Sequence, residues 1–108
     1  MRAVRFRGAG RALAVEEVPA PHPGAGEVVV AVACCGLCAT DLKMYRGRKA
    51  PRHPLPLTFG HEVAGRVAEV GEGVGHVAPG DRVLVSLAIT CDRCPSCRRG
   101  MPELCARL

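Results

Sequence analysis

Apolar and polar residues alternate along several short segments of the chain, a pattern typical of strands that rest one face on a core. Residues 2–7 alternate in this way, and residues 12–18 are the expected hairpin partner of that strand. Residues 61–71 alternate strongly, and residues 82–88 form the last expected strand. Residues 28–35, VVVAVACC, are an unbroken apolar run rich in β-branched residues, so we expect a strand that is buried on both faces and ends at the following glycine.

Only one segment of the main body has the features of a helix. Residues 40–46, TDLKMYR, are long enough for one or two helical turns. Either Thr40 or Asp41 is a suitable N-cap, and Gly47 is expected to stop the helix. The pattern therefore predicts many short strands and little helix.

Segments rich in Pro and Gly separate the expected strands. Residues 19–27 cannot pair in a sheet, residues 46–57 contain three prolines among several bases, and residues 72–81 are rich in turn formers. Gly65 interrupts its strand and predicts a bulge or a close backbone approach there. Short strands with regular turn signals indicate a mainly β fold, a small and partly open β-barrel with short helices.

The composition limits the size of the core and the cellular setting. A chain of 108 residues fits a single domain, and with no Trp, one Tyr and two Phe its core must be built from Val, Ala and Leu. No apolar run approaches the ~20 residues of a membrane span, and the N-terminus has no apolar signal region. We therefore expect no membrane contact and a cytoplasmic, reducing setting, in which clustered cysteines favour metal binding.

The net charge of +5 raises the question of nucleic-acid binding. The bases are scattered along the chain, and side chains that could stack on bases are nearly absent. A solvated basic surface without a nucleic-acid partner is the simpler explanation. A stand-alone, zinc-stabilised binding module without redox activity remains the alternative to an enzyme, and DNA retention that depends on salt would support it.

Four cysteines near the end of the chain have the spacing of a structural zinc site. Cys91, Cys94, Cys97 and Cys105 stand at spacing C-x2-C-x2-C-x7-C, so four thiolates can close a tetrahedral shell with no open position. The odd total of seven cysteines argues against disulfides, and the seven-residue excursion differs from that of bacterial iron–sulfur clusters. We expect zinc to hold a lobe at about residues 89–106, which has few apolar residues of its own.

A second metal site is suggested by one thiol and one imidazole. Cys38 and His61 each lie where an expected strand meets a loop, and Asp41 or Glu62 could fix the tautomer of the imidazole. A catalytic zinc needs a third protein ligand and an open position. On residue types alone, a buried thiol beside a capping imidazole explains the pair equally well. Cys35 with Cys38 could also form a redox pair, although no βαβ pattern surrounds them.

Four motifs together resemble the N-terminal, GroES-like catalytic domain of zinc-dependent medium-chain alcohol dehydrogenases. They are CGLCATD at residues 35–41, FGHEVAGRVAEVG at 59–71, PGDRV at 79–83 and CDRCPSCRRGMPELC at 91–105. Their order and spacing match those of the family over nearly the whole chain. The resemblance implies a GroES-like barrel, an oxidoreductase activity, and NAD or NADP as the coenzyme of the full-length enzymes.

The resemblance also assigns roles to single residues. Cys38 is similar to the first ligand of the catalytic zinc and His61 to the second, with Glu62 as the acidic residue beside that zinc. Asp41 is similar to the carboxylate that orients the histidine, and Thr40 to the hydroxyl residue that contacts the substrate oxygen and begins the proton relay. The four cysteines of the lobe match the structural-zinc ligands: Cys91, Cys94, Cys97 and Cys105.

The chain also departs from the family pattern. It has no G-x-G-x-x-G motif and no alternation of strands and helices, so the coenzyme-binding Rossmann domain is expected to be missing, as is the third catalytic-zinc ligand. Ala39 replaces an arginine that contacts coenzyme phosphates in some members, and Lys43 replaces a relay histidine. We expect a truncated domain that is inactive alone. Its small alcohol or carbonyl substrate would react only in the presence of a dinucleotide-binding domain, which a partner could supply in trans.

Overall fold

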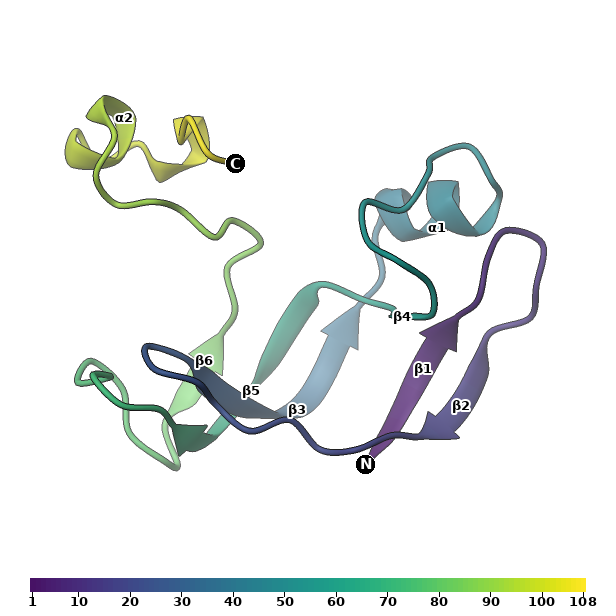
Figure 1. Cartoon of the computed structure of the whole chain (residues 1–108), viewed down its shortest axis with the longest axis horizontal. Coiled ribbons are helices and arrows are strands. Elements are labelled where there is room, and N and C mark those ends of the chain that lie inside the picture. The colour runs from purple at the N-terminus through teal and green to yellow at the C-terminus, as the bar shows by residue number, and fades with distance from the viewer.

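Two antiparallel sheets of three strands each form the body of the protein (Figure 1). The computed structural model describes every residue from Met1 to Leu108. The first sheet has the order β2-β1-β4 and the second the order β3-β5-β6. The strands are β1 (Arg2–Phe6), β2 (Ala14–Glu17), β3 (Val28–Gly36), β4 (Leu57–Thr58), β5 (Glu62–Val70) and β6 (Arg82–Leu84).

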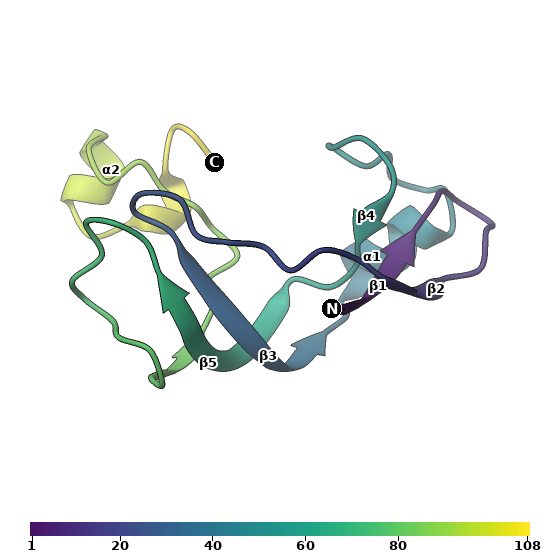
Figure 2. The ribbon, with the colours of Figure 1, turned by 60° about the horizontal axis from the view of Figure 1, so that its bottom comes forward.

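The helices are short, and they lie in two places: one follows the third strand, and the others form the C-terminal lobe. Helix α1 (Ala39–Tyr45) follows β3, whereas α2 (Pro95–Arg98) and the 3-10 helix η1 (Pro102–Leu104) belong to the lobe. Both ribbon views place the lobe beyond the end of β6, apart from β1 and α1 (Figures 1 and 2). None of these helices has the length and apolar character that crossing a membrane requires.

The mainly β, open architecture predicted from the sequence is confirmed. β1 and β2 pair antiparallel as the expected hairpin, with Val4 opposite Val15. The two sheets do not close into a barrel, because hydrogen bonds join strands only within each three-stranded sheet. The predicted strand at 82–88 is shorter than expected: β6 ends at Leu84, and beyond it only Val85 still bonds to β5.

The prediction that the apolar run of β3 is buried on both faces is wrong. No residue of Val28–Gly36 is buried, and Val32 is 56% exposed. The strand pairs with β5 along one edge, but no second layer of the chain covers the sheet. The core is correspondingly small, and its buried residues are Ala3, Phe6, Asp41, Phe59, Val67 and Cys105.

The long β3–β5 pair determines which residues meet at the end of the second sheet. Gly65 lies so close to the Ala31 carbonyl oxygen that a side chain would overlap it, as the predicted close approach requires. A register shift follows between Val32 and Cys34. The pair then continues to its end, where Gly36 of β3 lies opposite Glu62 of β5.

Helix α1 begins one residue earlier than predicted, and its N-cap is neither Thr40 nor Asp41. Cys38 is the N-cap, and its sulfur accepts a hydrogen bond from the Thr40 backbone N–H at 3.1 Å. The Asp41 carboxylate accepts the Cys38 backbone N–H at 2.9 Å, which completes a capping box. Gly47, at φ 70°, follows the last turn as expected.

Candidate metal centres

The end of the β3–β5 pair brings a thiol, an imidazole and a carboxylate together. Cys38 leaves β3 and caps α1, while His61 and Glu62 stand where β5 begins. One ligand atom from each of the three residues lies within 4.8 Å of the others. The antiparallel register therefore joins residues that are more than twenty positions apart in the sequence.

The imidazole of His61 has a different partner on each nitrogen. Nε2 lies 3.0 Å from the Cys38 sulfur, and Nδ1 lies 3.2 Å from Oδ2 of Asp41. Asp41 is only 4% exposed. A carboxylate that accepts the Nδ1 proton leaves the lone pair of Nε2 directed at Cys38, which is the arrangement of metal-binding histidines.

Hydrogen bonds and nearby charges lower the pKa of Cys38 and raise that of His61. The Thr40 backbone N–H is the largest cause of a lowered pKa at Cys38. Desolvation acts to lower the pKa of His61, but the Asp41 carboxylate and Cys38 outweigh it, so that pKa is raised. The polar groups thus already stabilise negative charge on sulfur and positive charge beside it.

These residues fit a zinc ion. A tetrahedral zinc holds a thiolate sulfur and an imidazole nitrogen about 3.6 Å apart, so from the observed 3.0 Å the two groups would have to separate by about 0.6 Å. The nitrogen that faces the sulfur is the one left free by Asp41. Glu62 is placed as a third donor within the same 4.8 Å.

The four cysteines of the C-terminal lobe also converge. The sulfurs of Cys91, Cys94, Cys97 and Cys105 all lie within 4.8 Å of one another, and those of Cys94 and Cys97 are 3.5 Å apart. Sulfurs around a tetrahedral zinc are about 3.8 Å apart, so the lobe matches the dimensions of the ion closely. Backbone N–H groups of Cys91 and Arg107 each lie 3.4 Å from the Cys105 sulfur.

Three thiols of the lobe have shifted pKa values, and the shifts differ in direction. A hydrogen bond from the Cys97 backbone lowers the pKa of Cys94 to about 6, and one from the Arg107 backbone lowers the pKa of Cys105. Burial raises the pKa of Cys97 to about 12, with its sulfur neighbours adding to the effect. Four adjacent thiolates repel one another, so a cation is required before all of them can ionise together.

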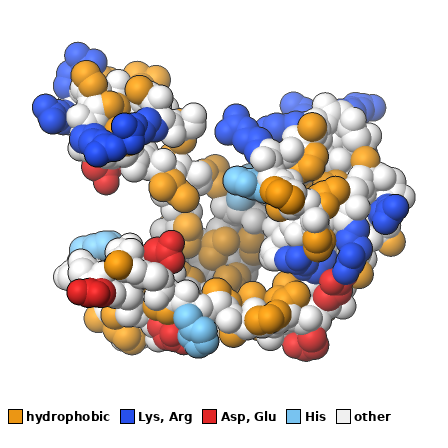
Figure 3. Space-filling view, in the orientation of Figure 1, with side chains coloured by type: hydrophobic (Ala, Val, Ile, Leu, Met, Phe, Trp, Pro, Cys, Tyr) orange, Lys and Arg blue, Asp and Glu red, His pale blue; other side chains and the backbone are white.

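The surface around the lobe is basic. Lys and Arg side chains gather on the lobe, at the upper left of Figure 3, and on the side that carries α1, at the right. Arg93, Arg98 and Arg99 lie among the four cysteines in the sequence, and four thiolates with a divalent ion would carry a net negative charge. On this face of the molecule the basic side chains form separate groups and not one continuous stripe (Figure 3).

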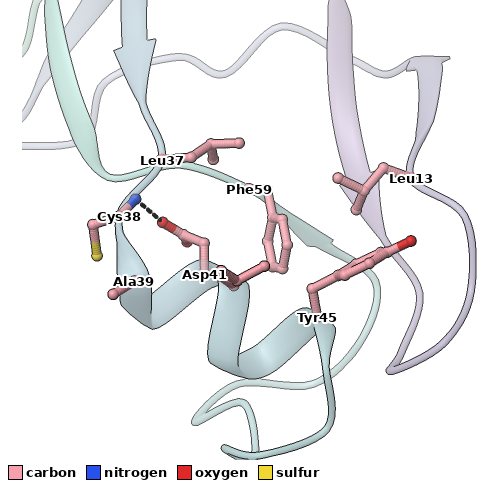
Figure 4. Close-up of a pocket in the computed structure, with 8 residues that line it drawn as sticks. Leu13, Leu37, Cys38, Ala39, Asp41, Tyr45 and Phe59 are labelled. Carbon is pink, nitrogen blue, oxygen red and sulfur yellow. Dashed lines mark hydrogen bonds between the residues drawn. The ribbon is translucent and has the colours of Figure 1, made fainter.

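An apolar cavity of about 550 Å³ lies between α1 and the β1–β2 hairpin. Its walls include Leu13, Leu37, Tyr45 and Phe59, and Figure 4 shows these side chains between α1 and the β1–β2 hairpin. The Cys38 sulfur points away from the Phe59 ring (Figure 4). Cys38 and Asp41 of the candidate site also line this cavity, so the cavity adjoins the site directly.

Comparison with known proteins decides the family. Residues 24–108 match the alcohol dehydrogenase GroES-like domain. The chain belongs to this family. It is 42% identical over 106 residues to an alcohol dehydrogenase of Moraxella sp. (strain TAE123), a match that covers 97% of this chain and 31% of that protein.

Solved structures agree with this assignment. A thermostable alcohol dehydrogenase from Pyrobaculum aerophilum, with cobalt and zinc bound, superposes with a TM-score of 0.88 at 36% identity, over 98% of this chain and 32% of that one. A zinc-binding dehydrogenase from Sinorhizobium meliloti 1021, bound to NADP, superposes with a TM-score of 0.75 at 38% identity, over 97% and 30%. The chain thus spans about a third of the length of these relatives.

The structure of this GroES-like domain places most predicted site residues together. Cys38, His61 and Glu62 share one cluster, with Asp41 on the far side of the imidazole. Their roles as metal ligands stay a prediction. Thr40 lies beside the Cys38 sulfur through its backbone N–H, a contact that the sequence did not indicate.

The alternative redox pair has no support in the contacts of Cys35. Its thiol is exposed, lies against Gly60, and has the Gly36 carbonyl oxygen at 3.8 Å as its partner. It does not belong to the cluster that contains Cys38.

Proposed function

We propose that this chain is the zinc-binding catalytic domain of an alcohol dehydrogenase-type oxidoreductase. In the complete enzyme the reaction converts an alcohol to an aldehyde or ketone, with NAD or NADP as hydride acceptor. The observation that carries the proposal is the His61 imidazole, with Nε2 3.0 Å from the Cys38 sulfur and Nδ1 3.2 Å from Asp41. The zinc-binding and NADP-bound relatives support the same assignment.

Each residue of the site has a distinct task in this proposal. A zinc ion held by Cys38, His61 and Glu62 supplies a Lewis acid that lowers the pKa of an alcohol hydroxyl. Asp41 holds His61 in the tautomer that leaves Nε2 free. The hydroxyl of Thr40, in the first turn of α1, would accept the proton of the substrate hydroxyl while passing its own proton outward to solvent.

The C-terminal lobe has a structural task. Four sulfurs around one ion leave no open position for a substrate, so a zinc ion there stabilises the fold and takes no part in the reaction. α2 and η1 are too short to form a core without it. The lobe therefore depends on metal more strongly than the sheets do.

Binding of the dinucleotide is assigned to another domain. The chain has no G-x-G-x-x-G motif and shows no alternation of strands and helices. That domain belongs either to the same polypeptide or to a partner that acts in trans. All seven cysteines are free, which suits a reducing compartment such as the cytoplasm.

Elemental analysis of the chain purified without chelator tests the proposal. We expect two zinc ions per chain, and one in a His61→Ala variant whose lobe is intact. A matched lobe variant, Cys97→Ser, should lose the other ion. One zinc in the wild-type chain, unchanged by His61→Ala, would overturn the catalytic site. Alcohol-dependent NAD reduction by the chain alone, free of host dehydrogenases, would contradict the need for a second domain.

A further inference from the structure

The carboxylate of Glu62 reaches the candidate catalytic site without a polar partner to hold it there. It belongs to the cluster with Cys38 and His61, yet none of the side-chain hydrogen bonds or ion pairs in the structure involves it. An exposed glutamate with no partner is normally free to extend into solvent. Some other feature must therefore allow this side chain to lie over the end of the sheet.

The residue directly opposite Glu62 is a glycine. Gly36 of β3 and Glu62 of β5 are partners in the antiparallel register, so their side-chain positions share one face of the sheet. A methyl group at Gly36 would overlap Oε2 of Glu62 and lie 3.0 Å from its Cβ and 3.3 Å from its Cδ. The glutamate side chain thus lies across the bare backbone of Gly36.

The backbone itself does not require glycine at this position. Gly36 is absent from the residues with positive φ, unlike Gly60, which has φ 95° and directly precedes His61. An alanine could adopt the extended conformation of Gly36 without strain. The side chain of Glu62, with its carboxyl oxygen as the nearest atom, is what a side chain at position 36 would meet.

We propose that Gly36 is a positioning residue for the catalytic metal. Because Gly36 has no side chain, the side chain of Glu62 can lie across the backbone of β3. Its carboxylate then faces the ion held by Cys38 and His61. This inference rests on the proposed function, because it assumes a metal at that site. Any larger residue at position 36 turns the carboxylate out to solvent and leaves the ion with two protein ligands.

Cobalt binding to the full 108-residue chain tests the proposal without a turnover assay. Co²⁺ in the four-thiolate lobe and Co²⁺ at Cys38 and His61 differ in their thiolate charge-transfer and d–d absorption, so one titration reports both sites. We expect Gly36→Ala to weaken cobalt binding at the second site about 10- to 100-fold and to leave the lobe unchanged. Gly75→Ala is the matched control, since a side chain there meets nothing within 4 Å.

A double-mutant cycle separates positioning from general damage. Glu62→Ala alone should weaken the second site to a similar degree, and Gly36→Ala should change it less than about twofold further in that background. If Gly36→Ala misfolds, rescue of folding by Glu62→Ala supports the same contact. Misfolding that persists in the double variant counts against it.

The remaining outcomes distinguish this inference from the proposed function. Two cobalt ions in both the wild-type and Gly36→Ala chains, with equal affinities, overturn the role of Gly36 and leave the zinc site standing. Independent, additive losses from Gly36→Ala and Glu62→Ala also overturn it. A single cobalt ion in the wild-type chain, bound at the lobe, overturns both.

Discussion

At the scale of single residues, one carboxylate oxygen joins the fold of α1 to the geometry of the candidate zinc site. Oδ2 of Asp41 accepts the Cys38 backbone N–H at 2.9 Å and lies 3.2 Å from Nδ1 of His61. Asp41 is thus half of the capping box and also the partner that orients the imidazole. Because the same oxygen serves both contacts, a change at Asp41 affects helix stability and metal binding together.

Two substitutions at Asp41 should separate these effects. Asp41→Ala removes the cap and the partner of His61, so we expect a loss of about 1 kcal/mol in the free energy of unfolding and about 10- to 100-fold weaker cobalt binding at Cys38 and His61. Asp41→Asn keeps an oxygen for the cap but no charge, and should restore stability without restoring affinity. Urea unfolding and cobalt titration measure the two quantities. Full recovery of affinity in Asp41→Asn would show that the charge is unimportant.

The uneven proton affinities of the lobe predict how zinc binding depends on pH. At pH 7 Cys94, with a pKa of about 6, is already a thiolate in the metal-free lobe, whereas Cys97, with a pKa of about 12, must lose its proton to bind. Zinc loading should therefore release fewer than four protons, at most about three, because the lowered pKa of Cys105 acts in the same direction. Calorimetry in two buffers of different ionisation enthalpy measures this number.

The same thiols determine whether zinc binding becomes stronger or weaker as the pH rises. Raising the pH toward 8 strengthens zinc binding, because the remaining protons leave more easily. Below pH 6 Cys94 becomes protonated as well, so the affinity should fall more steeply there. Release of four protons at pH 7, or an affinity that does not change with pH, would contradict these assignments.

At the scale of elements, the sequence predicted what depends on local pattern and missed what depends on distant packing. Local patterns located every strand except the two-residue β4, which lies at the end of an expected loop, and Gly65 marked a close backbone approach. These features are set mainly by neighbouring residues. The burial of β3 was wrong, since it depends on whether another layer covers the sheet. The N-cap was missed because Cys38 is an unusual capping residue, and the role of Gly36 because it depends on the register with β5.

The lobe is the element whose existence depends most directly on metal, and limited proteolysis should show this. With zinc bound, trypsin should cut slowly after Arg93, Arg98 and Arg99, which lie among the four cysteines. A chelator should speed these cuts by at least about tenfold, since the lobe has little folding free energy without metal. Cuts in the exposed loop at residues 46–53 serve as the control and should keep their rate. Equal rates in the lobe with and without chelator would mean that it folds without metal.

At the scale of the whole molecule, the chain exposes far more surface than a compact protein of its length. Its accessible surface is 7976 Å², against about 5,800 Å² expected for a monomer of this mass. Its radius of gyration is 15.7 Å, against about 13 Å expected. Leu84 and Ile89, on the segment that leads to the lobe, are 85% and 90% exposed. Apolar surface of this extent is typical of faces that another part of an assembly covers.

This open shape should appear in the denaturant dependence of unfolding. Folding removes about 8,500 Å² of surface from water in this chain, against about 10,700 Å² in a compact domain of the same mass. Because the urea m-value is proportional to this area, we expect it to be about a fifth smaller than for a compact domain. The measurement needs dilute, zinc-loaded protein at several concentrations. If copies associate through the exposed faces, the midpoint rises with concentration and the m-value with it. A full-sized m-value at the lowest concentration would mean that the sheets and lobe close onto one another in solution.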